Sequence, residues 1–132
     1  MIKTGMKIQT PGLLLKVNES APLPEKYAKL RDDLVKAIEA GRIAEESDPE
    51  DDGACNFDAC AVKLTRWNHD LVEQAAKDAG TRCFTWKCYR EKMFVFVPKT
   101  RSQGNARSRN AEAMTACMNA LGWDAMDYCQ MD

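Results

Sequence analysis

Basic side chains concentrate in the second half of the chain, where their types and spacing favour the binding of phosphate or carboxylate groups. Between Arg82 and Arg109 the sequence contains eight lysines and arginines and a single acid, Glu91. Guanidinium groups pair with such anions through two parallel hydrogen bonds, and the stretch leads into a predicted helix whose first N–H groups attract negative charge. We predict an anion-binding loop here, the alternative being a solvated loop neutralised by the protein's own acidic segment. The predicted basic contacts are Lys92, Lys99, Arg101, Arg107 and Arg109.

The segment Lys92–Val97 has the composition of a strand and contains two phenylalanines. Because side chains alternate across a strand, Phe94 and Phe96 share one face and the aliphatic residues share the other. We expect the aliphatic face to contact helices and the phenylalanines to lie on the open side, beside Trp86 of the preceding strand. Bases of nucleic acid stack on aromatic platforms of this kind, each for about 1–3 kcal/mol.

The same segment resembles the longer aromatic motif of RNA-recognition-motif domains, Lys/Arg-Gly-Phe-Gly/Ala-Phe-Val-x-Phe/Tyr. The matching positions are Lys92, Phe94, Phe96 and Val97. The positions that depart from the motif are Met93, Val95 and Lys99. The resemblance implies contact with RNA or another single strand. The alternative is that both faces of the strand are buried, one of them under the N-terminal helix, as is usual for a strand that is apolar on both sides.

Acidic residues form a second charged segment, which contains no base between Glu45 and Asp58. Such a run can dock on a basic protein surface, as expected of an adaptor or an inhibitor of the kind carried by phages and other mobile elements. It can equally be a solvated linker, and it lacks the ligand spacing of a calcium loop. The candidate docking residues are Glu45, Glu46, Asp48, Glu50, Asp51 and Asp52.

Cysteine and histidine give no pattern of a catalytic or metal centre. The six cysteines include two pairs with four intervening residues, a spacing that is poor for zinc when the pair lies on a strand. His69 is the single histidine, and nothing selects a cysteine to partner it. No phosphate-loop, dinucleotide or nucleophile-elbow motif occurs. We therefore predict a non-catalytic binding module without metal or cofactor; a binder of small anionic ligands, or an enzyme, is the third hypothesis.

The pattern of elements predicts an α+β fold in one domain, residues 1–132. Residues 55–132 have the order β-α-β-β-α-β, which is the ferredoxin-like pattern of an antiparallel sheet with two helices on one face. Residues 1–44 are expected to form an extended segment and an amphipathic helix, residues 25–40, that ends at Gly41 and could cover the second face of the sheet. Residues 45–54 are expected to form the acidic loop.

Composition places the chain among globular proteins of a reducing compartment. Apolar residues make up 45% and charged residues 30% of the sequence, and no apolar run approaches the ~20 residues of a membrane span. The N-terminus lacks a secretory signal, so we expect a cytoplasmic protein with reduced thiols. The predicted partner is nucleic acid or a basic protein surface, and the oligomeric state is open.

Overall fold

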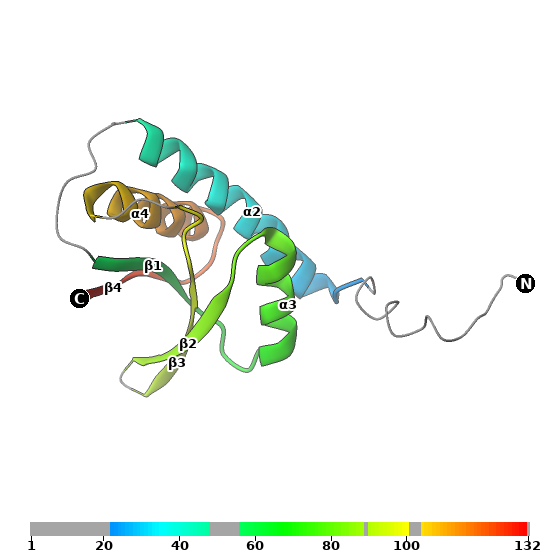
Figure 1. Cartoon of the computed structure of the whole chain (residues 1–132). Coiled ribbons are helices and arrows are strands. Elements are labelled where there is room, and N and C mark those ends of the chain that lie inside the picture. The colour runs from blue at the N-terminus through cyan, green and yellow to red at the C-terminus, as the bar shows by residue number, and fades with distance from the viewer. Residues whose placement is uncertain (1–21, 48–55, 89, 101–103, 132) are drawn as a thin grey trace, which may run out of the picture.

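The computed structural model describes residues 22–47, 56–88, 90–100 and 104–131 of the chain. These residues form three helices and a four-stranded antiparallel sheet (Figure 1). The helices are α2 (Glu25–Glu46), α3 (His69–Ala79) and α4 (Gly104–Ala120). The strands are β1 (Asn56–Lys63), β2 (Cys83–Cys88), β3 (Glu91–Phe96) and β4 (Ala125–Met131). The α+β class and the antiparallel sheet that the sequence predicts are confirmed.

The strands lie in the order β2-β3-β1-β4, so β3 and β1 are central and β2 and β4 are the edges. Each neighbouring pair is antiparallel, with Val62 opposite Phe94 in the central pair. From β1 onward the elements follow one another as β-α-β-β-α-β, as the sequence predicts.

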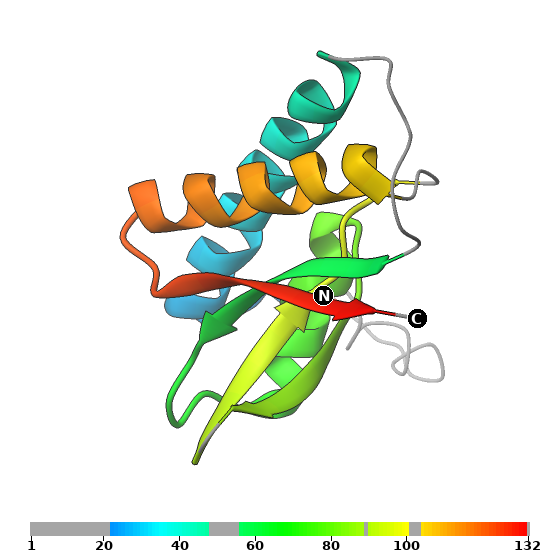
Figure 2. The same cartoon turned by 90° about the vertical axis from the view of Figure 1, so that its left-hand side faces the viewer.

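All three helices lie on the same side of the sheet (Figures 1 and 2). Helix α4 packs on β1 and β4, α3 contacts β2, and α2 crosses over α3 and α4. Two polar contacts join α2 to distant turns: the Tyr27 hydroxyl accepts the Asn68 N–H at 2.8 Å, and Asp33 accepts the Trp123 indole N–H at 2.9 Å. Helix α2 therefore thickens the helical layer and does not cover the opposite face of the sheet.

Helix α2 continues through Gly41, so the helix end that the sequence pattern predicts there is wrong. Gly41 is buried against α4, and a Cβ at this position would overlap the side-chain oxygen of Asn110. The missing side chain thus allows two helices to approach closely. Gly80, by contrast, ends α3 as predicted, with a left-handed φ of 100°. No helix in the described part of the chain is long and apolar enough to cross a membrane.

The core lies between the sheet and the helices and contains the large rings of β3. Phe94 and Phe96 are fully buried there with Leu30, Leu34 and Met114 of the helices. The expectation that both phenylalanines point to the open side is therefore wrong. Three helices leave a deep space above the central strands, and the larger side chains of these strands fill it.

The opposite face of the sheet is closed by the protein's own edge strands. Ala59, Ala61 and Val95 on the central strands have no exposed surface, although α2, α3 and α4 all lie on the other side of the sheet. The rings of Trp86 on β2 and Tyr128 on β4 pack against this small-residue patch. Trp86 lies on this outer face as expected, but without Phe94 and Phe96 beside it.

Candidate anion-binding groove

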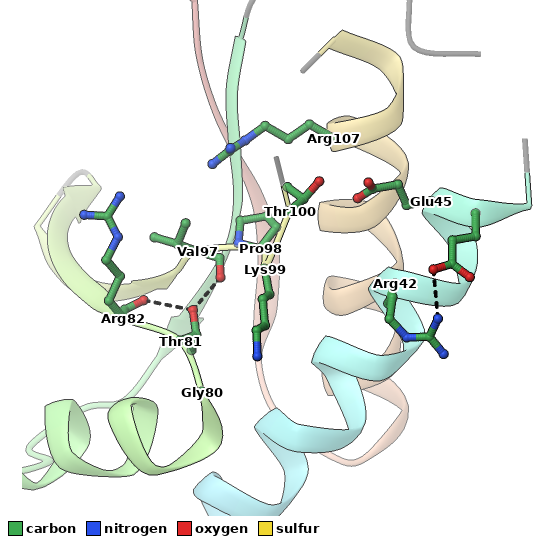
Figure 3. Close-up of a pocket in the computed structure, with 11 residues that line it drawn as sticks. Arg42, Glu45, Gly80, Thr81, Arg82, Val97, Pro98, Lys99, Thr100 and Arg107 are labelled. Carbon is green, nitrogen blue, oxygen red and sulfur yellow. Dashed lines mark hydrogen bonds and ion pairs between the residues drawn. The ribbon is translucent and has the colours of Figure 1, made fainter. Parts of the chain in front are cut away.

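A groove of about 810 Å³ lies between the C-terminal part of α2, the turn after α3, the segment after β3 and the start of α4 (Figure 3). Residues from both charged segments of the sequence meet in it. Its lining residues are Arg42, Glu45, Glu46, Gly80, Thr81, Arg82, Val97, Pro98, Lys99, Thr100 and Arg107.

Four of the lining side chains are basic, and each comes from a different part of the chain. Arg42 is on α2, and Arg82 directly precedes β2. Lys99 follows β3, and Arg107 lies in the first turn of α4. Against them stand two carboxylates, those of Glu45 and Glu46. The balance favours an anion, since a concave surface lined mainly by one sign of charge concentrates ions of the other sign.

The floor of the groove is a hydrogen-bonded frame that joins β2 to β3. The Thr81 hydroxyl donates to the Val97 carbonyl at 2.5 Å, and the Val97 N–H donates to the Arg82 carbonyl at 3.1 Å. These two bonds tie Thr81 and Arg82 to Val97, two residues before Lys99. The bases therefore project from a rigid support, which lowers the conformational cost of binding.

Lys99 lies beside the C-terminal end of α3. Its Nζ is 3.8 Å from the place that a Cβ of Gly80 would occupy, and in Figure 3 its side chain extends toward this glycine. The end of a helix carries partial negative charge from its last carbonyls, which stabilises an ammonium group. A side chain at position 80 would narrow the groove at this point and would be strained at a φ of 100°.

The α2 side of the groove is largely neutralised. Arg42 is ion-paired with Glu39 at 2.5 Å and with Glu46 at 2.9 Å. Hydrogen bonds from the guanidinium to these carboxylates raise the pKa of Arg42 above its ordinary value and lower that of Glu39. Glu45 accepts a hydrogen bond from the Asn110 amide at 2.8 Å. The positive potential is therefore strongest on the opposite side, at Arg82 and Lys99.

The two arginines that begin α4 are held by backbone carbonyls of their neighbours. Arg107 Nε donates to the Asp58 carbonyl at 3.2 Å, and an Arg109 terminal nitrogen donates to the Glu45 carbonyl at 3.3 Å. Both side chains are partly buried, and neither is free. Arg107 still lines the groove, whereas Arg109 does not.

The other residues that the sequence nominates are dispersed. Lys92 lies at the start of β3, at the far end of that strand from Lys99. Trp86 is on the outer face of the sheet, and Phe94 and Phe96 are in the core. Predicted contacts outside the described residues are Arg101, Asp48, Glu50, Asp51 and Asp52. The structure thus brings together Lys99 and Arg107, with Glu45 and Glu46 facing them from α2.

Two groove residues, Arg42 and Arg82, are not among the contacts that the sequence predicts. Arg82 belongs to the basic stretch, but its place in the same groove as Lys99 depends on the β2–β3 pairing. Arg42 follows Gly41, and its position depends on the crossing of α2 and α4, which the sequence pattern does not specify.

Four thiols have a raised pKa, which disfavours the nucleophilic thiolate form. Burial raises the pKa of Cys60 and of Cys83 to about 11. The pKa of Cys117 is also raised by burial, and that of Cys129 by its hydrogen bond with Asp58. All four are free cysteines. None of them has the lowered pKa of a catalytic thiol.

The comparisons with known proteins give no relative: no family model, no curated protein and no solved structure matches the chain.

Proposed function

We propose that the protein is a non-catalytic binding module that engages the phosphate backbone of single-stranded nucleic acid through the groove. Phosphates would contact Arg82 and Lys99, with Arg107 at the α4 end. Glu45 and Glu46 would keep the strand away from α2, because carboxylates repel phosphates. Such contacts position a strand without selecting its sequence.

The observation that supports this proposal most is that bases from four segments line one groove, with the carboxylates confined to its α2 side. Single bases are scattered over most protein surfaces, but a concave basic surface on a fixed backbone frame resembles the grooves that follow nucleic-acid backbones. The groove contains no aromatic residue. Base stacking on Phe94 and Phe96 is not part of the proposal, since both rings are buried.

The test is the affinity of the full chain for a labelled single-stranded oligonucleotide, measured by fluorescence anisotropy over a series of salt concentrations. The double variant Arg82→Ala/Lys99→Ala should bind about tenfold or more weakly, a change of about 1.4 kcal/mol. Loss of two phosphate contacts should also reduce the slope of log affinity against log salt by about 1.4.

The matched control is Arg31→Ala/Lys36→Ala, which removes the same charge from α2 outside the groove. We expect its affinity to stay within about twofold of the parent, a difference expected for charges that make no phosphate contact. An equal loss in both variants would mean that net charge alone drives binding. A parent protein that does not bind the oligonucleotide at low salt would reject the proposal.

We also propose that residues 56–131 have the ferredoxin-like topology. Its supports are the element order β-α-β-β-α-β, the antiparallel pairing of all neighbouring strands and the shared side of α3 and α4. Several nucleic-acid-binding modules present a four-stranded sheet to their ligand, but here the proposed site lies at the end of the strands.

A further inference from the structure

A second basic cleft, of about 380 Å³, lies between the loop after β1 and the turn that joins β2 to β3. It shares no lining residue with the groove. Lys92 lies near the start of β3 and Lys99 three residues after its end, so at 3.3 Å per residue the two are at most about 23 Å apart along the chain. The residues of this cleft that bear on binding are Lys63, Arg66, Trp67, Arg90, Glu91 and Lys92.

The cleft has more unneutralised positive charge than the groove. Its single carboxylate, Glu91, is ion-paired with Lys63 at 2.9 Å, and hydrogen bonding in this pair raises the pKa of Lys63. Arg66, Arg90 and Lys92 are exposed and make no ion pair with any residue of the described ranges. Three positive side chains therefore border a small volume whose one carboxylate is already paired with Lys63.

Arg66 has a left-handed backbone in the turn that the Trp67 N–H closes on the Leu64 carbonyl at 3.3 Å. Its φ is +66°, and it is the one non-glycine residue with a positive φ in the part of the chain that the structure describes. The left-handed conformation is unfavourable for a residue with a long side chain, and glycine or asparagine would adopt it more easily. Strained residues of this kind cluster at ligand sites.

Trp67 supplies an aromatic wall next to these bases. Its ring makes edge-to-face contacts with the rings of Tyr27 and Trp123, with centroid separations of 4.9 Å and 5.6 Å. Lys26 Nζ lies 4.5 Å from the centroid of the Trp67 ring. The side chain is partly exposed, so a fixed indole borders the cleft. An indole beside guanidinium groups suits a ligand that carries both a ring and a phosphate.

We infer that this cleft is a second binding site, for a nucleoside phosphate: Arg66, Arg90 and Lys92 contact the phosphate, and the base lies against Trp67. The site rests on its own residues and does not depend on the groove. The nucleoside phosphate comes either from a free nucleotide or from the phosphorylated end of a strand.

The test follows the indole N–H signals of the three tryptophans in nuclear magnetic resonance spectra while the full chain is titrated with adenosine 5′-monophosphate. We expect a saturable shift of the Trp67 signal and no shift for Trp86, which lies on the outer face of the sheet. An unshifted Trp67 signal at millimolar nucleotide would overturn the inference.

The deciding variant is Arg66→Asn/Arg90→Gln, in which asparagine tolerates the left-handed backbone and the fold is kept. We expect its affinity for the nucleotide to fall about tenfold or more, the effect of losing two charge-assisted contacts. The matched control Arg31→Gln/Lys36→Gln removes two charges from α2, outside both the groove and the cleft, and should leave this affinity unchanged. Equal affinity of the parent and the Arg66→Asn/Arg90→Gln variant would overturn the assignment.

Two further titrations identify whether the phosphate belongs to a free nucleotide or to the end of a strand. The first compares an oligonucleotide that carries a 5′-phosphate with its dephosphorylated copy. If the phosphorylated form shifts the Trp67 signal at a lower concentration, the natural ligand is the end of a strand. Preference for the mononucleotide supports a free nucleotide, and a shift with the dephosphorylated oligonucleotide alone overturns the inference. The Arg82→Ala/Lys99→Ala variant separates this site from the proposed function. If it no longer binds the oligonucleotide but its Trp67 signal still shifts with the mononucleotide, the two sites act independently.

Discussion

The two faces of the sheet are both apolar, but they are buried by different means. The inner face carries Phe94 and Phe96 under three helices. The outer face carries Ala59, Ala61 and Val95, with Met93 beside them, under rings that belong to the sheet itself. The size of the side chains on the central strands thus indicates what covers them: large residues fill the space below helices, and small residues let the edge strands close over them.

The outer arrangement depends on Tyr128, which reaches across the sheet. The centroid of its ring is 4.9 Å from that of Trp86 and 5.7 Å from that of Phe84, and both pairs have edge-to-face geometry. Tyr128 is on β4 and the other two rings are on β2, so the rings bridge two central strands, a backbone distance of about 14 Å at 4.8 Å per strand. Rings can meet over this distance only because the residues between them are small.

The largest difference between the faces should appear when one ring is removed from each. Phe94→Ala should lower the free energy of unfolding by about 3–5 kcal/mol, the cost of a cavity in a rigid core. The outer-face counterpart is Phe84→Ala. Phe84 is 36% exposed, so this substitution should lower the free energy of unfolding by about 1 kcal/mol or less. Urea denaturation measures both, and equal costs would contradict the distinction between the faces.

A fall in pH should weaken the contacts that stabilise the helical side of the sheet and should leave the contacts on its outer face unchanged. Burial of Asp33 favours its neutral form, but hydrogen bonds from Lys29 and Trp123 outweigh this and hold the pKa of Asp33 below its ordinary value. A carboxylate with a lowered pKa stabilises the fold above its unfolded pKa, and this contribution is lost as the pH falls through the folded pKa. The buried polar residues of the described chain, Asp33, Asp58, Asn110 and Thr115, all belong to the helices or to the inner face of the sheet.

We expect Asp33→Asn to lower the free energy of unfolding by about 1.5–3 kcal/mol at pH 7, the worth of hydrogen bonds to a charged group. The difference from the parent should shrink below about pH 4, where the parent carboxylate also becomes neutral. Urea denaturation at several pH values gives this profile. A difference that stays constant down to pH 3 would show that the charge of Asp33 is not what stabilises the contact.

On the outer face, Tyr128→Ala should cost about 1–2 kcal/mol, because it exposes the alanines of β1 and removes two ring contacts. The matched control is Met126→Ala on the same strand and face, whose side chain is 42% exposed and should cost about 0.5 kcal/mol. The Trp86 indole should also become more exposed to solvent, which red-shifts its fluorescence in the Tyr128 variant alone. An unshifted emission would indicate that Tyr128 does not cover this part of the sheet.

The sequence predicts the helices and strands of this fold better than it predicts their faces. Alternation separates Phe94 and Phe96 from Met93 and Val95, but both sets are apolar, so periodicity does not say which set faces the helices. The neighbouring strand contains the missing information: β1 places Cys60 and Val62 on the inner face and two alanines on the outer one. Comparison of side-chain volume across neighbouring strands would have assigned the faces correctly.

The candidate groove was predictable only in part, for a similar reason. Lys99 and Arg107 stand out by their charge and by the helix that follows them. The contribution of Arg42 depends on where α2 crosses α4, and this crossing depends on Gly41. A glycine within a helical pattern predicts either a helix end or a close helix contact, and the sequence does not distinguish these cases.

Gly41→Ala tests whether the helical layer has room at that crossing, and it should give the smallest net effect. An added Cβ would overlap the Asn110 side-chain oxygen and lie 2.9 Å from the Asn110 backbone oxygen, so α2 and α4 must move apart. Overpacking lowers the free energy of unfolding by about 1–3 kcal/mol. The higher helix propensity of alanine than of glycine raises it by about 0.5–1 kcal/mol. The net loss in the free energy of unfolding should therefore be about 1 kcal/mol.

The partner variant Asn110→Ala separates the two contributions to this loss. In its background, Gly41→Ala should cost less, since the amide oxygen is gone and the backbone contact alone remains; double-mutant urea denaturation measures the coupling. A net gain in stability from Gly41→Ala in the parent would mean that the helices are loosely packed here. Because Arg42 follows Gly41 directly, such looseness would also remove the basis for a fixed α2 wall in the groove, so this variant tests the scaffold of the proposed site as well as the fold.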